Sequence, residues 1–271
     1  MSFCDLALSR RLERAEGHAC TQFAEARRHL FPDSGAEWVE VAGTYAVFDG
    51  ADSPITQSFG VGIFEELSVG PLEIIERFFF DHAAPVSHEV SPFAGVNALN
   101  LLCARGYRPI ELSSILYRTV EAAASEPEGA VTVRVVGPKE TQLWTDVSAR
   151  GWAHEYPELL NFLLQVGAIS SARKETLCFL AELDGKAGAA GALCLHQGVA
   201  LFGGSATVPE LRRRGLQTAL LQERMRYAFE HGCDLAMMAA QPGSDSQRTA
   251  ERKGFRIAYT RTKWQLPLAT H

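Results

Sequence analysis

The chain has 271 residues, of which 46% are hydrophobic and 21% charged, and its formal net charge is −6. This apolar fraction supports a folded core and excludes a wholly disordered chain, and the length suits one large or two small domains. No run reaches the roughly 18 apolar residues of a membrane helix. The first twenty residues lack the basic start and apolar block of a secretory signal. We therefore expect a cytoplasmic protein with no membrane partner.

The cysteines predict neither a disulfide framework nor a zinc site. No two of them form a CxxC pair, and no histidine stands at zinc-ligand spacing from them. We expect reduced thiols and no metal. The six positions are Cys4, Cys20, Cys103, Cys178, Cys194 and Cys233.

Charge is divided unevenly between the two halves of the chain. Residues 1–120 carry nine arginines, no lysine and sixteen acids, whereas residues 121–271 carry nearly equal numbers of bases and acids. An acidic half either attracts a cationic substrate or forms a solubilising surface. No basic field covers the chain, so nucleic acid is not an expected partner.

Hydrophobic periodicity and turn residues predict alternating helices and strands in the front half. One helix or two are expected over 4–30, further helices over 71–83 and 97–105, and strands over 37–41, 45–48, 58–63, 85–90 and 107–118. The polar, acidic stretch 122–129 is the expected linker.

The pattern then restarts in the back half. Strands are expected over 131–136, 176–183, 187–196, 199–208, 234–240 and 255–266, and helices over 139–152, 157–171 and 244–253. The segment 208–232 is expected to be a loop that feeds a long amphipathic helix. The two halves end alike, because a helix stops at Gly106 or Gly254 and an aromatic residue and an arginine then begin a long strand. This weak internal repeat predicts a duplicated α/β unit, with chance similarity as the alternative.

The stretch from Val208 to Leu220 carries the chemistry, because it links a predicted strand to a predicted helix. A helix start has unpaired N–H groups and partial positive charge, and Gly215 lets an anion approach the backbone. An arginine- and glycine-rich turn at this point predicts a cradle for a pyrophosphate. Its spacing is neither GxxxxGK[ST] nor GxGxxG. The alternative is a solvated basic turn or an RNA-facing patch.

This stretch resembles the pyrophosphate-binding motif R/Q-x-x-G-x-G/A of the GCN5-related N-acetyltransferases (GNAT). Arg212 and Gly215 match the motif, and Pro209 precedes it as it often does in that family. Gln217 stands where Gly or Ala is usual, which is a departure. The resemblance implies acetyl-CoA as cosubstrate, bound by Ala206, Thr207, Val208, Arg212, Arg213, Arg214, Gly215, Leu216, Gln217 and Thr218.

A second family landmark is missing. Many members carry, four residues before the closing glycine of the next helix, a tyrosine that protonates the leaving thiolate, but here that position is Ala250. Ser246 is our candidate for assisting thiolate departure, while Ser244 is expected to cap the helix.

The base that takes a proton from the incoming ammonium is not assigned by the sequence. Glu89 with His88 is one candidate, and the others are His154, Glu155 and Tyr156.

The front half lacks the cradle. Glu65 and Glu66 stand where it is expected and repel a pyrophosphate, and Pro71 lacks an N–H. We therefore predict a degenerate module that does not bind CoA and whose roles are to complete the sheet, cover the substrate cleft and supply acceptor contacts. The candidate cleft residues are Trp38, Glu40, Phe48 and Glu89.

Together these observations predict an α/β protein of two GNAT-like modules, each a mixed twisted sheet flanked by helices. The modules are residues 1–121, degenerate, and 130–271, which bind acetyl-CoA. The implied function is transfer of the acetyl group to a primary amine of a small molecule or peptide by direct attack. The alternative is a non-catalytic acyl-CoA sensor or regulatory protein. The acceptor is not encoded in these motifs, and a homodimer is left open.

Overall fold

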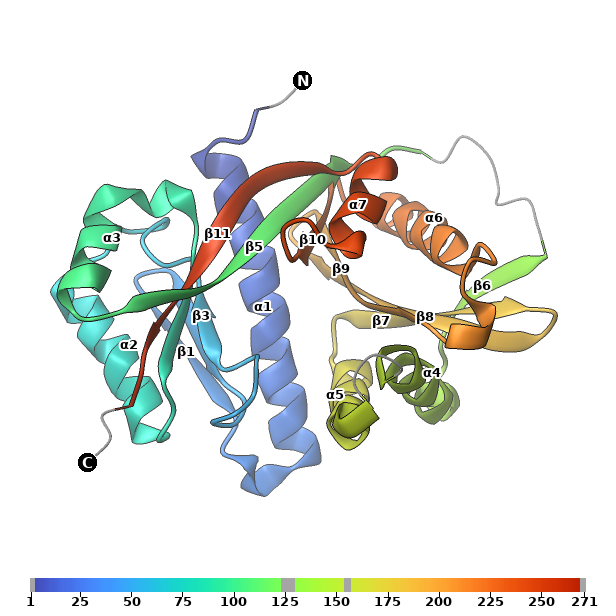
Figure 1. The fold of residues 1–271 in the computed structure, drawn as a ribbon, viewed down its shortest axis with the longest axis horizontal. Helices are drawn as coiled ribbons and strands as arrows, with labels where there is room; N and C mark the ends of the chain where they lie inside the picture. Colours follow the sequence, from blue (N-terminus) through green and yellow to red (C-terminus); the bar gives the residue numbers. More distant parts are fainter. Residues whose placement is uncertain (1–2, 123–129, 154–156, 269–271) are drawn as a thin grey trace. The chain divides into compact units, whose positions relative to one another are not determined.

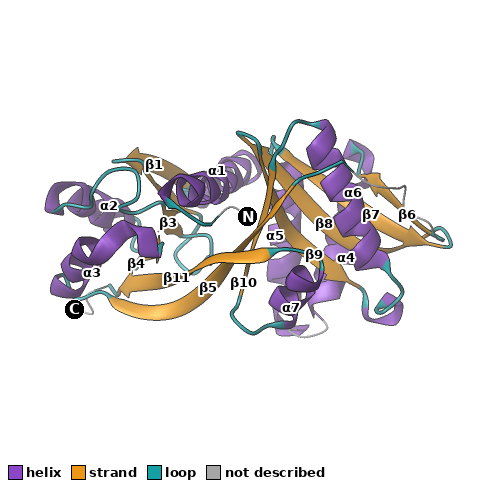
Figure 2. Cartoon of the chain, turned by 90° about the horizontal axis from the view of Figure 1, so that it is seen from above, coloured by secondary structure: helices purple, strands orange, loops and turns teal. Residues whose placement is uncertain are grey.

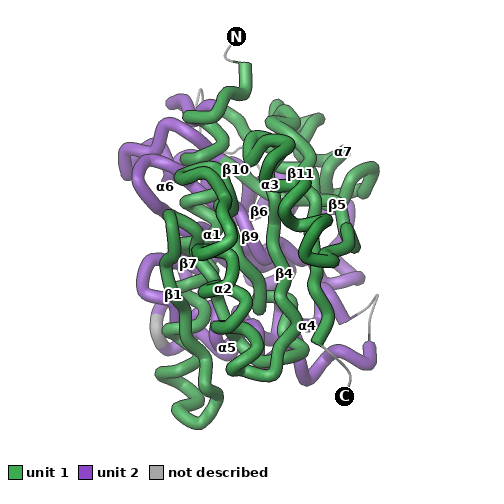
Figure 3. The backbone as a smooth tube through the Cα atoms, turned by 90° about the vertical axis from the view of Figure 1, so that its left-hand side faces the viewer, with its two compact units in different colours: residues 1–118, 237–271 green, residues 119–236 purple. Residues whose placement is uncertain are grey.

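The computed structural model describes residues 3–122, 130–153 and 157–268. The chain forms two compact units, coloured in Figure 3. Unit 1 comprises Met1–Arg118 and Met237–His271, and unit 2 comprises Thr119–Ala236. These units divide the chain differently from the predicted sequence modules, because the last 35 residues pack with the front half. The predicted linker lies, from residue 123 to 129, outside the described residues.

Unit 1 is a mixed sheet with helices on both faces (Figures 1 and 2). Its strand order is β1-β2-β3-β4-β11-β5, in which β3 and β4 are parallel and the other neighbours antiparallel. The helices are α1 (Leu6–Leu30), α2 (Val69–Asp81), α3 (Gly95–Ala104) and α7 (Asp245–Arg252). The strands are β1 (Glu37–Val41), β2 (Thr44–Phe48), β3 (Gln57–Phe59), β4 (Val86–Val90), β5 (Arg108–Thr119) and β11 (Arg256–Leu266).

The alternation of side chains along β2 assigns the two faces of this sheet. Ala46 and Phe48 belong to the core under α2 and α3, whereas Val47 packs with Ala24 of α1. Gly17 allows α1 to lie close to the sheet, because a Cβ at that position would come within 2.9 Å of the Tyr45 ring. Unit 1 is therefore a three-layer α/β/α arrangement, as the sequence predicts.

Two predicted elements in the front half differ in extent from those observed. β3 ends at Phe59 rather than at residue 63, because Gly60 and Gly62 adopt positive φ angles of 80° and 72° and turn the chain. α2 begins at Val69, two residues before Pro71. Proline is tolerated there because the first N–H groups of a helix have no intrahelical acceptor.

Unit 2 contains four antiparallel strands in the order β9-β8-β7-β6. The strands are β6 (Val131–Val135), β7 (Thr176–Leu183), β8 (Lys186–His196) and β9 (Val199–Thr207), and the helices are α4 (Thr141–Ala153), α5 (Leu160–Ala172) and α6 (Leu216–Glu230). β10 (Leu235–Ala240) contains the boundary between the units in the sequence. No helix among the described residues is both long enough and apolar enough to cross a membrane.

Helices cover both faces of the unit 2 sheet (Figure 1). Cys178 and Leu180 of β7 pack in the core with Trp144 of α4. Phe179, which points to the other face, meets the ring of Tyr227 of α6 at 5.7 Å between centroids. This alternation places α6, and the turn that precedes it, on the face opposite α4.

The repeated junction predicted at the end of each half exists as a repeated backbone geometry. Gly106 and Gly254 both adopt left-handed conformations, with φ of 87° and 85°. In each case the aromatic residue that follows, Tyr107 or Phe255, donates its N–H to the carbonyl five positions back, at 3.0 and 3.1 Å. This is a glycine-terminated helix end that positions an aromatic anchor at the start of the next strand.

Candidate functional site

The turn between β9 and α6 exposes its backbone. After β9 the chain makes a short 3₁₀ turn, Pro209–Leu211, and α6 then begins at Leu216 with Gly215 as its N-cap residue. Gly215 has φ of 87°, and a Cβ built on it would meet no atom within 4 Å. Arg213 also has positive φ, 61°, and both it and Gly215 are exposed.

The start of α6 fits an anionic diphosphate. No side chain caps the helix, and the first N–H groups of a helix have no intrahelical acceptors and carry partial positive charge. The exposed guanidinium groups of Arg213 and Arg214 stand next to these N–H groups in the sequence. Open space at Gly215 lets a phosphate reach the backbone. The donor set and the space therefore agree with the predicted cradle.

Arg212 has a different role from its two neighbours. Its Nε donates to the carbonyl of Thr207 at 3.3 Å, and its Nη2 donates to the carbonyl of Gly151 at 3.1 Å. Because those carbonyls belong to β9 and α4, Arg212 ties the turn to both elements. The guanidinium groups of this turn that remain exposed belong to Arg213 and Arg214.

Gln217, the departure from the family motif, is also engaged in shaping the turn. Its Nε2 donates to Oγ1 of Thr207 at 2.7 Å, so the first turn of α6 is bonded to the last residue of β9. Thr218, the next residue, is half-buried.

Three further predicted residues are buried apolar side chains, so only their backbone is available to a ligand. They are Ala206, Val208 and Leu216. The N–H of Val208 donates to the carbonyl of Gly188 at 2.9 Å, which fixes the end of β9 against β8.

Two glycines that sequence reasoning missed allow this close packing. A Cβ on Gly151 would lie 2.6 Å from Cβ of Ala206, and one on Gly188 would lie 2.3 Å from Cδ1 of Leu211. Glycine therefore lets α4 approach β9 and lets the 3₁₀ turn approach β8. Gly151 interrupts an otherwise helical pattern, which was the available signal for such a contact.

The helix start at Ser244 is as predicted. Ser244 caps α7 by accepting a hydrogen bond from the N–H of Gln247 at 3.2 Å. Ser246, in the first turn, is exposed. Ala250, at the position of the absent tyrosine, is 4% exposed and its carbonyl accepts the N–H of Phe255. A larger side chain at Ala250 would have to displace its packed neighbours.

Glu89 and His88 lie in β4 and are buried in unit 1. Glu89 forms ion pairs with Arg261 at 2.8 Å and with Lys263 at 3.5 Å, both from β11. His88 contacts Oγ of Ser58 at 2.6 Å. Burial lowers the pKa of His88 to about 3, so it is neutral at physiological pH. These contacts give both side chains partners that stabilise the sheet.

The remaining candidates of the front half also have partners within unit 1. Trp38 is half-buried and donates its Nε1–H to Glu25 at 3.1 Å. Glu40 forms an ion pair with Arg14 at 2.8 Å, and Phe48 is buried in the core.

The other candidates for the base cannot be placed in this site. His154, Glu155 and Tyr156 lie outside the described residues.

The acidic excess of the front half is partly buried. Four of its acids are at most 4% exposed: Glu13, Asp49, Glu76 and Glu89. Each forms an ion pair with an arginine of unit 1, namely Arg261, Arg27 or Arg105. These four acids therefore neither solubilise the surface nor attract a substrate.

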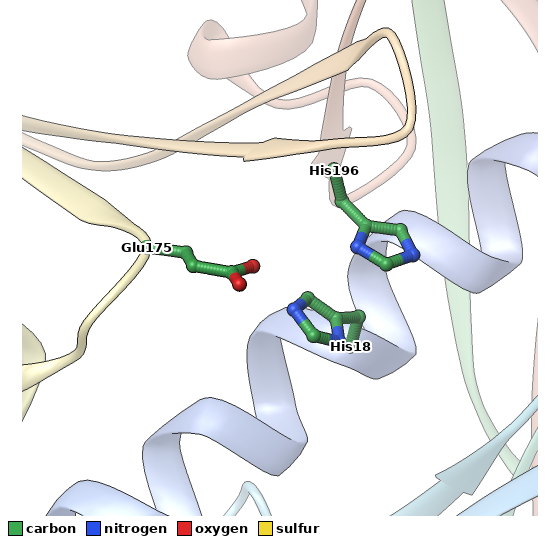
Figure 4. A group of neighbouring side chains, drawn as sticks. All are labelled: His18, Glu175 and His196. Carbon is green, nitrogen blue, oxygen red and sulfur yellow. The ribbon is translucent and has the colours of Figure 1, made fainter.

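Glu175 and His196 form a pair of polar side chains in unit 2, and they lie far from the Gly215 turn along the sheet. Figure 4 shows Glu175, directly before β7, and His196, at the end of β8. Side-chain atoms of the two come within 4.8 Å of each other. They stand at the hairpin end of β9, whereas the cradle follows its other end, Thr207. β9 has nine residues, and each strand residue advances the chain by about 3.3 Å, so the two ends of β9 are more than about 20 Å apart.

The family of the back half is shown by comparison with known proteins. Residues 141–255 match the acetyltransferase (GNAT) family. This range contains the turn at Gly215 and ends at the repeated glycine–aromatic junction. No curated protein sequence matches the chain significantly.

Solved structures extend the likeness in fold to most of the chain. A GCN5-related N-acetyltransferase from Kribbella flavida is 20% identical, with 92% of this chain and 95% of that one covered and a TM-score of 0.63. One from Sphaerobacter thermophilus is 17% identical, with 95% and 94% covered and a TM-score of 0.58. A tandem GNAT protein from the clavulanic acid biosynthesis pathway is 11% identical, with 98% and 95% covered and a TM-score of 0.58.

The chain thus carries a GNAT-family domain over residues 141–255, and its fold over most of its length is that of GNAT proteins. The predicted family resemblance and the mixed α/β fold class are confirmed. The family match begins only at residue 141, in keeping with a diverged front half.

Proposed function

We propose that this chain transfers the acetyl group of acetyl-CoA to a primary amine of a small molecule or peptide. One observation carries the proposal: the family domain contains an uncapped helix start with open space at Gly215 and exposed guanidinium groups beside it. A diphosphate needs this set of donors.

In the proposed complex, both backbone groups and side chains bind acetyl-CoA. The N–H groups at the start of α6 hold the diphosphate, and Arg213 and Arg214 neutralise its charge. The backbone of β9 before the turn pairs with the pantetheine arm. Bound acetyl-CoA supplies an activated thioester. A backbone N–H of β9 aimed at the thioester carbonyl is worth roughly 2.7–4 kcal/mol of transition-state stabilisation in comparable sites.

The proposed reaction is direct attack without an acyl-enzyme. The ammonium first releases one proton to water, the neutral nitrogen then forms the new bond to the acetyl carbon, and the bond from that carbon to sulfur breaks as the nitrogen loses its second proton. The sulfur leaves as a thiolate that takes up a proton. We propose Ser246 as the hydroxyl that assists this departure, because it is exposed in the first turn of α7.

A non-catalytic acyl-CoA binder is the second candidate function. Ala250 favours it, because the phenol that protonates the thiolate in many family members is absent and the position is packed. This candidate predicts binding of CoA without turnover.

The experiment measures CoA affinity by calorimetry and thiol release from acetyl-CoA with a panel of amines. We expect micromolar CoA binding by the wild type and amine-dependent thiol release. Arg214→Glu should weaken CoA binding at least tenfold. Arg226→Glu, a matched charge reversal near the other end of α6, should change it less than twofold.

Each outcome separates the candidates. Binding without thiol release for any amine favours the sensor, and absence of CoA binding overturns both. Equal weakening by the two charge reversals would show that the diphosphate does not sit at the Gly215 turn.

A further inference from the structure

Arg224 is a buried arginine on α6, nine residues after the turn. It is 2% exposed. Its guanidinium donates to the carbonyls of Leu220, Ala192 and Gly203 at 3.2, 3.1 and 3.5 Å, and to Oγ of Ser205 at 2.9 Å. All these acceptors are neutral, and no described carboxylate forms an ion pair with it. Burial lowers the pKa of Arg224 to about 10, so it keeps its charge at physiological pH. A buried charge without an acid is costly and needs an explanation.

Three of these acceptors, Ala192, Gly203 and Ser205, lie where the pairing of β8 with β9 is irregular. Ala190 of β8 pairs with Ala206, and Ala192 of β8 pairs with Gly203. Two steps along β8 therefore correspond to three along β9, so β9 contains one extra residue, a β-bulge. Gly204, inside the bulge, is exposed and has φ of 59°.

The guanidinium bridges the two strands where the bulge interrupts their pairing. Nη1 donates to Gly203 on β9 and to Ala192 on β8, and Nη2 donates to Ser205 on the far side of the bulge. Gly191 provides the room, because a Cβ there would come within 2.9 Å of Nη1. Arg224 and Gly191 are therefore fitted to each other.

We propose that Arg224 is a positioning residue for acyl transfer, because its guanidinium holds the bulge in β9 and so sets how residues 205–207 are presented to acetyl-CoA. This inference rests on the proposed function. A strand that loses a one-residue bulge shifts its register by one, which turns its following groups to the opposite face. The locked bulge prevents that shift in the strand that leads directly to the Gly215 turn.

The geometry predicts a division between catalysis and binding. The proposed diphosphate donors are N–H groups of α6 and the guanidinium groups of Arg213 and Arg214, all of which lie outside β9. Loss of Arg224 should therefore lower kcat while leaving CoA affinity nearly unchanged. Lysine should not replace it, because one ammonium cannot present the planar fork that reaches both strands.

The test compares Arg224→Met and Arg224→Lys with Arg226→Met as the matched control. Arg226 lies on the same helix, is half-buried, and pairs with Glu223 and Glu230. We expect both Arg224 variants to lower kcat for thiol release at least 30-fold with CoA Kd within threefold. Amide exchange of residues 201–207 should rise at least tenfold while that of residues 220–228 stays unchanged. Arg226→Met should alter none of these.

Wild-type kcat or unchanged exchange over 201–207 in Arg224→Lys would overturn the proposal. If Arg224→Met does not fold, Arg224→Lys and Ser205→Ala decide the question, since Ser205→Ala removes one acceptor alone and should raise exchange in the same segment. If the wild type binds no CoA, the proposed function fails by itself. The exchange comparison then still shows whether Arg224 holds the bulge.

Discussion

The front and back halves each contain a strand, a turn and a helix in the same order, with opposite chemistry in the turn. In the back half, β9 leads through Gly215 into α6, and Arg213 and Arg214 are exposed beside the open helix start. In the front half, β3 leads into α2 through a segment that places exposed Glu65 and Glu66 before the helix. Two acids in place of two arginines reverse the charge that an anion would meet.

The helix starts differ in their backbones as well. Gly215 adopts a left-handed conformation, whereas Ser68, which precedes α2, is extended. Pro71 lies in the first turn of α2 and supplies no N–H. Under the proposed function, a shared strand–turn–helix order is therefore not sufficient for an anion site. The proposed site depends on a few turn residues, and the front half retains the fold without them.

The largest effect should follow from separating the halves. Deleting residues 1–120 removes β4 and β5, which are both neighbours of β11, and leaves Arg261 without its carboxylate partners. We therefore expect the fragment 121–271 to lack acetyl transfer and to be unfolded or insoluble, as measured by thiol release and circular dichroism. Co-expression with residues 1–120 should restore part of the activity. A soluble, fully active fragment would show that the halves are independent modules.

The next largest effect should come from closing the cradle. Gly215→Val places a β-branched side chain at positive φ and fills the open space, so CoA binding should weaken at least 100-fold, about 2.7 kcal/mol. Gly232→Val is the matched control, because Gly232 has φ of 75° and equally open surroundings at the other end of α6. It should carry a similar backbone strain with wild-type CoA affinity in calorimetry. Equal loss of affinity in both variants would attribute the effect to the helix alone.

A smaller effect, on kcat alone, is expected from replacing Ser246, a residue that distinguishes the two repeated helix–glycine junctions. Eight residues before the closing glycine stands exposed Ser246 in the back half and buried Ala98 in the front half. If Ser246 assists thiolate departure, Ser246→Ala should lower kcat about 100-fold with little change in KM for acetyl-CoA. The control is Ser244→Ala, which should cost about 1 kcal/mol of stability through the lost cap and leave kcat unchanged. Wild-type turnover by Ser246→Ala would exclude this role.

The elements and the open helix start at Gly215 were predictable because they depend on local rules. Periodicity, proline and glycine indicated the order of helices and strands, and the Arg/Gly turn indicated where α6 begins. The contacts of Arg212 with Gly151 were not predictable, because they join residues 61 positions apart. Arg224 falls on the face of α6 that carries Leu216 and Leu220. A charged residue on that apolar face was the sequence signal for a buried arginine with a structural role. Its acceptors arise from a bulge that side-chain alternation does not reveal.

The smallest expected effect concerns the pH dependence of the unfolding free energy, which a buried acid of the front half should control. Glu13 of α1 is buried against Arg261 and accepts a hydrogen bond from the Tyr259 hydroxyl at 2.8 Å. Burial raises its pKa to about 7 from the ordinary 4.5. Between these values the folded protein binds a proton that the unfolded chain has released. This contribution to stability is therefore complete below pH 4.5 and is lost as the pH rises through 7.

Glu13→Gln should remove that pH dependence, because the amide does not titrate. From pH 5 to pH 8, the wild type should lose about 1–2 kcal/mol of unfolding free energy relative to Glu13→Gln, as measured by urea denaturation. Glu40→Gln, at an exposed acid of β1, should keep the wild-type slope. Parallel pH profiles for the wild type and Glu13→Gln would mean that Arg261 keeps Glu13 ionised throughout. Arg261 would then hold its carboxylates as fixed charges that stabilise the fold of unit 1.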